Sequence, residues 1–379
     1  MKQRLQWYVQ SRCVKAFLTN LSRQGILDNM TSKPTTSHMS TAEADVPTTL
    51  AGTGRTHHMT LYGIREEQPG PRWQALHDAT RQGYHGWYLS EGEGARPDLR
   101  TCREMLARHM PELVPVWERL VELSGGDEVT ARLLTLWDPP RFLPGCSQAT
   151  VGGRTPLLVR NYDYGLDLFE RVVYSSAFTG RRVLGTGDCL WGLLDGMNDA
   201  GLAVSLAFGG RPGAGAGFGI PIVVRYLLEM AASIDDVRSV LRRVPVNMSY
   251  NLTFVDGSGE GLTAFVAPDS APEFSPARVA TNHRGTVPEY PERAQSLRSV
   301  ERQRSLRSLL DSNPDITGLT SAFLRPPLRN IEYGRAFGTL YTVAYRPKDG
   351  VADYLWPDDS WRRTFDSPDA TKTVILKES

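Results

Sequence analysis

Residues 138–165 read DPPRFLPGCSQATVGGRTPLLVRNYDYG, and this stretch decides which fold the chain adopts. Its beginning is rich in turn-forming residues, whereas apolar and polar residues alternate on both sides of the glycines at 152 and 153. Alternation around a glycine-rich turn is typical of two antiparallel strands. We therefore predict a β-hairpin over residues 149–165, at the point where the chain changes from helical to strand patterns.

Downstream of this hairpin, strand and helix patterns follow one another. LWGLLDGMNDAGLAVSLAFGG at 190–210 and SYNLTFVDGSGEGLTAFVA at 249–267 predict two more hairpins, and residues 338–356 predict a final strand pair. Helical periodicity occurs at 219–233, 233–244 and 293–312. Antiparallel hairpins interleaved with helices favour an α+β fold of four layers, αββα, in which helices cover both outer faces of two stacked antiparallel sheets.

Upstream of the hairpin, residues 59–145 are expected to be mainly helical. A strand-like segment at 59–64 precedes helical patterns at 80–91, 97–125 and 127–137. We expect residues 59–145 and residues 146–379 to pack together as one domain.

Residues 1–58 have a different composition. Ser, Thr, Met and Pro cluster at 30–49, and a basic amphipathic pattern covers 5–27. Such segments bury little apolar surface. We predict a disordered or amphipathic extension, and we favour the interpretation that translation begins upstream of a working protein that starts near Met59.

The overall composition excludes several classes of function. Forty-three Lys and Arg balance 42 Asp and Glu, so no global charge attracts nucleic acid. No apolar run is long enough to cross a membrane. The four cysteines form no CxxC pair, which argues against a zinc site and a disulfide framework. We expect a cytoplasmic protein with reduced thiols, no metal and no cofactor.

Cys146 directly follows Gly145, just ahead of the hairpin. Because glycine has no side chain, the carbonyl carbon of Gly145 is open to attack by the neighbouring thiol. Hydrolysis after this N-to-S acyl shift would free the amine of Cys146. An α-amine has a pKa of about 7.7 to 8.0, so it can accept the proton of its own thiol. We predict that self-cleavage makes Cys146 both nucleophile and base.

The motif RNYD at 160–163 ends the second strand of the hairpin, where the chain returns toward Cys146. An arginine there would favour the thiolate, and an aspartate would orient the new ammonium group. On a regular strand, however, Arg160 and Asp163 lie on opposite faces. They cannot both point at one atom unless the strand ends or bulges at this place.

Several motifs now occur in a fixed order over roughly residues 59–360. They are GCS at 145–147, RNYD at 160–163, DGMNDAGLAVSLAFGG at 195–210, TNH at 281–283, SVERQRSLRSLL at 299–310 and GTLYTVAYRPKDG at 338–350. Together they resemble the N-terminal-nucleophile (Ntn) hydrolase superfamily, in the branch of acyl-coenzyme A:6-aminopenicillanate acyltransferase, whose members are peptidase C45-like linear amide C–N hydrolases. Choloylglycine hydrolase and penicillin V acylase are more distant relatives. The resemblance implies the four-layer Ntn hydrolase fold.

The resemblance also implies roles for individual residues. Cys146 looks like the nucleophile and processed terminus, Arg160 like the arginine beside the thiol, and Asp163 like the carboxylate that orients the amine. Asn282 looks like an oxyanion donor. Arg302 looks like a second active-site arginine, although the alignment of SVER also allows Arg298.

One position departs from the pattern of choloylglycine hydrolases. Ala207 stands at the place of their oxyanion-hole asparagine, so a backbone N–H near Ala207 is the expected substitute. This departure argues against bile-salt chemistry.

The function predicted from these residues is hydrolysis of a linear amide in a small N-acyl substrate through a Cys146 thioester. A second hypothesis is an acyltransferase that passes the acyl group from acyl-CoA or an amide to an amine acceptor. A third is an unprocessed hydrolase with a Cys146–His283 pair, and a fourth is a non-catalytic binding protein.

Overall fold

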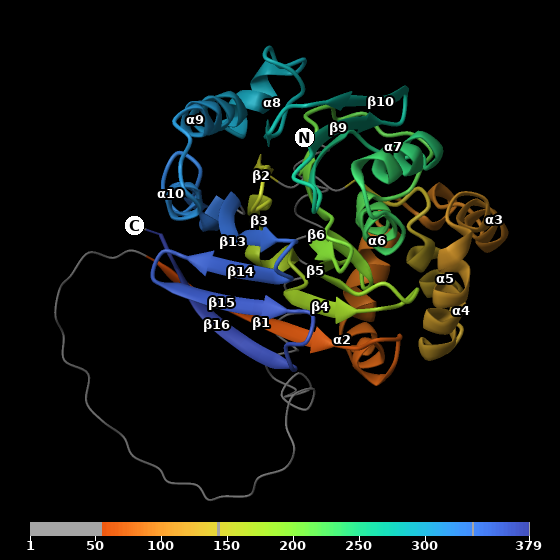
Figure 1. Ribbon diagram of the computed structural model, residues 1–379. Coiled ribbons are helices and arrows are strands. Elements are labelled where there is room, and N and C mark those ends of the chain that lie inside the picture. The colour runs from red at the N-terminus through yellow and green to blue at the C-terminus, as the bar shows by residue number, and fades with distance from the viewer. Residues whose placement is uncertain (1–54, 142–144, 336, 379) are drawn as a thin grey trace, which may run out of the picture.

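The computed structural model of the protein describes residues 55–141, 145–335 and 337–378, and Figure 1 shows their arrangement around two stacked sheets. Within these residues the larger sheet has nine strands, in the order β10-β9-β8-β7-β6-β5-β4-β1-β16. Their bounds are β1 Thr56–Arg65, β4 Val172–Ser176, β5 Val183–Asp188, β6 Gly192–Asn198, β7 Ala203–Phe208, β8 Tyr250–Val255, β9 Gly261–Ala267, β10 Ser270–Ser275 and β16 Ala370–Lys377.

The smaller sheet has the order β11-β2-β3-β13-β14-β15, and β12 pairs with β13. Its strands are β2 Gly145–Val151, β3 Leu157–Tyr164, β11 Val279–Ala280, β12 Ile331–Glu332, β13 Phe337–Arg346, β14 Val351–Trp356 and β15 Asp359–Thr364. The two sheets meet through buried side chains, and Gln148 of β2 bridges them by bonding the Ser205 side chain of β7 and the Asn251 carbonyl of β8.

Helices cover the outer face of each sheet (Figure 1). α6 (Ile220–Met230) and α7 (Ile234–Arg243) cover the larger sheet, whereas α9 (Ser299–Asp311) and α10 (Ile316–Phe323) cover the smaller one, next to the short α8 (Pro291–Ser296). The predicted α+β fold with four layers is therefore confirmed.

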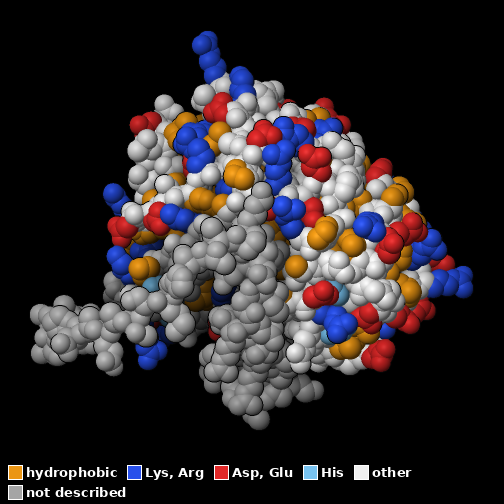
Figure 2. Space-filling view, turned by 90° about the horizontal axis from the view of Figure 1, so that it is seen from below, with side chains coloured by type: hydrophobic (Ala, Val, Ile, Leu, Met, Phe, Trp, Pro, Cys, Tyr) orange, Lys and Arg blue, Asp and Glu red, His pale blue; other side chains and the backbone are white. Residues whose placement is uncertain are grey.

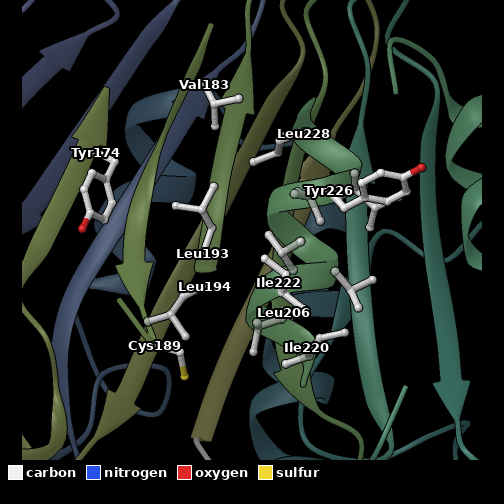
Figure 3. Close-up of a cluster of buried hydrophobic side chains, with 14 of the residues drawn as sticks. Tyr174, Val183, Cys189, Leu193, Leu194, Leu206, Ile220, Ile222, Tyr226 and Leu228 are labelled. Carbon is white, nitrogen blue, oxygen red and sulfur yellow. The ribbon is translucent and has the colours of Figure 1, made fainter. Parts of the chain in front are cut away.

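α6 forms because Pro221 stands in its first turn and apolar residues follow at helical spacing. Nearly all of its residues are buried, among them Ile222 and Leu228. Figure 3 shows these two side chains between the helix and the strands of the larger sheet, with Leu206 of β7 close by. This contact fixes the outer layer against β6 and β7.

The segment before the hairpin is mainly helical, as predicted. It contains α2 (Pro71–Tyr88), α3 (Leu99–His109), α4 (Val114–Leu123) and α5 (Glu128–Thr135). The single helical pattern predicted at 97–125 is interrupted after His109, because Pro111 lacks an N–H and disfavours helical backbone at Met110. Asp98 and Asp127 cap α3 and α5 through the N–H groups of Thr101 and Thr130.

All three predicted hairpins are present, as β2–β3, β6–β7 and β8–β9, and β13–β14 forms the predicted strand pair. That pair is not the final one, however. β15 and β16 follow it, and β16 pairs with β1.

β1 joins the segment upstream of Cys146 to the sheet formed by the rest of the chain. It pairs antiparallel with β16 and parallel with β4, and it begins at Thr56, three residues before the predicted start. Most of the predicted extension, residues 1–54, lies outside the described residues. Among the described residues, no helix is long and apolar enough to span a membrane. On the face shown in Figure 2, acidic and basic side chains are interspersed.

Candidate active site

Cys146 is the second residue of β2 and pairs with Tyr162 of β3. Its side chain is fully buried and lies on the face of the smaller sheet that meets the larger sheet. The guanidinium of Arg160 lies on the same face, and its Nη2 donates to Cys146 Sγ at 3.2 Å. The predicted pairing of this arginine with the thiol is therefore present in the structure.

Arg160 is itself held from the larger sheet. Its Nη1 bonds the Asp195 carboxylate of β6 and lies 3.2 Å from the hydroxyl of Tyr341 on β13. The Tyr341 hydroxyl also donates to Asp195 Oδ2 at 2.7 Å. A planar guanidinium with partners on both terminal nitrogens has little freedom to turn.

The backbone of Cys146 contacts a different set of residues. Its N–H donates to Asn282 Oδ1 at 3.0 Å, and its carbonyl accepts from Arg302 Nη1 at 2.6 Å. Arg302 Nη2 donates to the same Asn282 oxygen at 2.8 Å. Arg302 comes from α9, which covers the outer face of the smaller sheet. Of the two arginines allowed by the alignment, the structure brings Arg302 to Cys146, and Arg298 lies at the N-cap of α9.

Asp163 lies opposite Gly145 on the outer face of the smaller sheet. Its Oδ2 is 3.4 Å from Arg302 Nη1, and its Oδ1 accepts from the Thr339 hydroxyl at 2.6 Å. The β2–β3 pairing is regular, so Arg160 and Asp163 do point to opposite faces. They act on different atoms: Arg160 contacts the thiol, whereas Asp163 meets the arginine that holds the backbone of Cys146.

Burial controls the charges at this site. It raises the pKa of the Cys146 thiol, although Arg160 opposes the shift, so the thiol of the intact chain is protonated at neutral pH. Burial also raises the pKa of Asp163, against the influence of Arg302. Burial alone would lower the pKa of Arg160, but the thiol, Tyr341 and Asp195 outweigh it, and the pKa of this guanidinium lies well above its ordinary value.

Ala207 and Asn282, the two predicted oxyanion donors, lie close together. Ala207 is buried on β7 opposite Asn251, and the next carbonyl, that of Phe208, accepts from Asn282 Nδ2 at 3.1 Å. The backbone N–H of Asn282 donates to the Ser299 hydroxyl at 2.8 Å, which fixes the TNH segment against α9.

The ring of His283 also faces Ser299, whose hydroxyl lies 2.7 Å from His283 Nδ1. Burial lowers the pKa of His283, so the ring is neutral. The thiol of Cys146 is paired with Arg160 instead of with this histidine. The geometry therefore gives no support to the hypothesis of a Cys–His pair.

The sequence predicted Cys146, Arg160, Asp163, Asn282 and Arg302 as site residues, and the structure brings all five together. The prediction from sequence missed Asp195, although that residue stands in the quoted DGMN motif. The available signal was a carboxylate inside the apolar strand LWGLLDGM, because a charge there needs buried partners. Among the described residues, no group of three His, Cys, Asp or Glu side chains is placed to hold a metal ion.

Several solved structures resemble the chain at low sequence identity. Solved structures that resemble the chain include a mutant of the conjugated bile acid hydrolase of Clostridium perfringens, at 12% identity and a TM-score of 0.41, covering 60% of this chain and 96% of that one. Penicillin V acylase from Agrobacterium tumefaciens has 14% identity and a TM-score of 0.41, with 60% and 90% covered. An N-acylethanolamine-hydrolyzing acid amidase ortholog of Caenorhabditis elegans has 16% identity and a TM-score of 0.42, with 57% and 99% covered.

No curated protein sequence matches the chain. The model of one protein family, however, matches residues 150–361, which are more than half of the chain. That family comprises Ntn enzymes that transfer acyl groups or hydrolyse acyl amides. The chain therefore belongs to the acyl-coenzyme A:6-aminopenicillanic acid acyl-transferase family.

Proposed function

We propose that this protein is a self-processing cysteine amidase that cleaves the amide C–N bond of a small N-acyl substrate. The observation that carries the proposal is the set of polar contacts to Cys146 at the start of β2. Arg160 contacts its thiol, while Asn282 and Arg302 contact its backbone. A buried cysteine that only packs in a core needs neither set of partners.

The first step of the proposed reaction is self-cleavage. Cys146 Sγ attacks the carbonyl carbon of Gly145, the bond from that carbon to the Cys146 nitrogen breaks, and the nitrogen takes the thiol proton. Water then hydrolyses the thioester, which leaves a carboxylate on Gly145 and regenerates the thiol. The Asn282 oxygen that accepts from the Cys146 N–H is placed to accept from the new amine as well.

In the mature enzyme the amine of Cys146 takes the thiol proton and passes it to the leaving amine of the substrate. The sulfur bonds to the acyl carbon, the amide C–N bond breaks, and water releases the acid. Arg160 stabilises the thiolate, and the pair of Asp163 and Arg302 orients the amine. We assign stabilisation of the tetrahedral oxyanion to the side-chain amide of Asn282 and the backbone N–H of Ala207. Ala207 lies near the end of β7, where the Asn282 amide bonds the carbonyl of the next residue, Phe208.

Acyl transfer is the second candidate, because the matching family is described by an acyltransferase. The same thioester would then be attacked by an amine instead of water, with acyl-CoA or an amide as the donor. We favour hydrolysis because transfer requires a second binding site for the acceptor amine. A reaction with and without a primary amine, followed by mass analysis of the products, distinguishes the free acid from a new amide.

Intact-mass measurement of wild type and Cys146→Ala tests the proposal. Wild-type protein should yield two fragments divided between Gly145 and Cys146, whereas the variant should remain one chain without amidase activity. The matched control is Cys102→Ala, a buried cysteine on α3 that is remote in sequence from the motif, which should be processed normally. An active wild-type enzyme that is still a single uncut chain would contradict the proposal.

A further inference from the structure

Asp195 is the centre of a buried group of hydroxyls between the two sheets. Among the described residues, Arg160 and Tyr341 bond its Oδ2, while Tyr345 donates to Oδ1 at 2.6 Å and Thr186 donates to Oδ1 at 2.7 Å. All of these side chains are fully buried. The carboxylate thus accepts from partners on β3, β5 and β13, and none of these hydrogen bonds involves Cys146.

A buried carboxylate is costly unless each of its oxygens has donors, and here both do. The arrangement is also asymmetric. Only Oδ2 faces Arg160, whereas Oδ1 is anchored by Thr186 and Tyr345, and the Thr186 hydroxyl in turn lies 2.9 Å from that of Tyr354 on β14. Thr186 and Tyr345 therefore fix the carboxylate through Oδ1, and the fixed carboxylate holds Arg160 Nη1 through Oδ2.

The guanidinium is rigid, so holding Nη1 determines where Nη2 points. Nη2 is the atom that donates to Cys146 Sγ. An arginine on the neighbouring strand without this anchor would have several rotamers, most of which leave the thiol. The centre of the Tyr162 ring lies 4.8 Å from the Arg160 guanidinium carbon, so the ring packs against the guanidinium but supplies no hydrogen-bond acceptor in that contact.

We propose that Asp195 is a positioning residue of the nucleophile: through its bond to Arg160 Nη1 it keeps the other guanidinium nitrogen on the thiol of Cys146, and Tyr341 belongs to the same device. This inference rests on the proposed function and deepens it. Asp195 has no contact with the reacting sulfur, so it acts only through the arginine.

The direction in which the pH dependence of Cys146 thiolate formation shifts on substitution of Asp195 distinguishes a positioning role from a purely electrostatic or purely structural one. The charged groups that bear on the thiol are Arg160 and Asp163 from β3 and Arg302 from α9. If Asp195 positions Arg160, then Asp195→Asn releases the guanidinium and the thiolate becomes harder to form. If Asp195 acts only as a nearby negative charge, its removal makes the thiolate easier to form. A purely structural residue changes stability without moving the profile.

The experiment measures the rate of Cys146 alkylation by iodoacetamide against pH, in folded wild-type and Asp195→Asn protein whose other cysteines are replaced by Ala. We expect the midpoint of the Asp195→Asn profile to move up by about one pH unit, so that alkylation at neutral pH is about tenfold slower. A midpoint that is unchanged or lower overturns the inference.

Two tyrosines provide a matched pair. Tyr341→Phe and Tyr345→Phe each delete one fully buried hydroxyl that donates to Asp195, but only Tyr341 also contacts Arg160. The inference requires an upward shift in Tyr341→Phe that is clearly larger than the shift in Tyr345→Phe. Equal shifts would contradict it. These variants also remain informative if Asp195→Asn does not fold.

Alkylation needs no substrate, so the result is independent of turnover. A wild type that is never processed and hydrolyses no amide would refute the proposed function, whereas the pH profiles would still show whether Asp195 controls the thiol. In an active enzyme, Asp195→Asn should lower kcat and leave KM nearly unchanged, because the proposed role acts on the thiol through Arg160 and not on substrate binding.

Discussion

Gly145 lies where a side chain has no room. A Cβ at this position would overlap the ring of Phe337 and lie 3.2 Å from the Cβ of Asp163, so the Phe337 ring or one of the strands β3 and β13 would have to move. Gly145→Ala should therefore displace the carbonyl that the thiol would attack in the proposed self-cleavage. Since misplacement by about 1 Å can cost about 100-fold in rate, we expect processing to slow by that order.

A time course of fragment formation by denaturing electrophoresis measures this effect. The matched control is Gly213→Ala, because a Cβ at 213 meets no atom within 4 Å. Processing of Gly145→Ala at the rate of wild type and Gly213→Ala would show that the packing at 145 has no bearing on self-cleavage.

At the scale of residues, members of the candidate site could be predicted where reactive residues are neighbours in the sequence. The cysteine after glycine and the RNYD motif, together with the resemblance, selected Cys146, Arg160 and Asp163 as candidates, and the structure places the three close together. The alternation of a strand also indicated that Arg160 and Asp163 face opposite sides. What the sequence could not show is that Arg302, 156 residues beyond Cys146, connects Asp163 to the backbone of that cysteine. That contact depends on where α9 packs.

At the scale of elements, loss of the contact between α6 and the larger sheet should lower the free energy of unfolding most clearly. Ile222 is 0% exposed on α6 and packs toward β6 and β7 (Figure 3). Ile222→Ala should lower the free energy of unfolding by about 2 to 5 kcal/mol, because it leaves a cavity that the layers cannot close.

Denaturant titration measures this loss, and Ile316→Ala serves as its control. Ile316 is also a helical isoleucine, in the first turn of α10, but it is 37% exposed. The control should lose much less stability. Equal losses in the two variants would mean that α6 is not a firmly packed layer.

Whether an element could be predicted depended on the clarity of its local pattern. The three hairpins have glycine-containing turns between alternating strands, and all three are present. β15 was missed because its sequence, DSWRRT, is largely polar. β16, with the sequence ATKTVILK, was missed because its pairing partner β1 is distant in the sequence. β16 becomes a strand through β1, more than 300 residues earlier in the chain, and local patterns carry no information about such a partner.

Across the whole molecule, the position of β1 predicts the fate of the two fragments. Cleavage after Gly145 would leave β1 in the small fragment, but β1 lies between β4 and β16 of the large fragment. The small fragment should therefore stay bound without a covalent link. Size-exclusion chromatography of processed protein should give one peak containing both fragments, and denaturant should be required to separate them. Two peaks in native buffer would contradict this arrangement.

A second property of the whole molecule is its dependence on pH, and Asp188 should contribute to it. Asp188 ends β5, where its Oδ1 accepts from the Cys189 N–H at 2.8 Å and lies 3.4 Å from the Tyr84 hydroxyl, which also donates to Glu170. Burial, with the nearby Glu170 carboxylate, raises the pKa of Asp188 from 3.8 to about 7. Between about pH 4 and pH 7 the folded protein therefore keeps a proton on Asp188 that the unfolded chain has released. This proton stabilises the folded state at low pH, and the stabilisation is lost as the pH rises through 7.

Asp188→Asn removes this titration while keeping an oxygen that can accept from Cys189. The stability of the variant relative to wild type should therefore increase from about pH 4 to pH 7 and stay level above that, by up to about 4 kcal/mol since each pKa unit is worth about 1.4 kcal/mol. Thermal unfolding of both proteins in a pH series measures the difference. Asp358→Asn, at a side chain that is 79% accessible, is the control and should follow wild type. A constant difference between Asp188→Asn and wild type from pH 4 to pH 8 would show that Asp188 is not held in its neutral form by the folded chain.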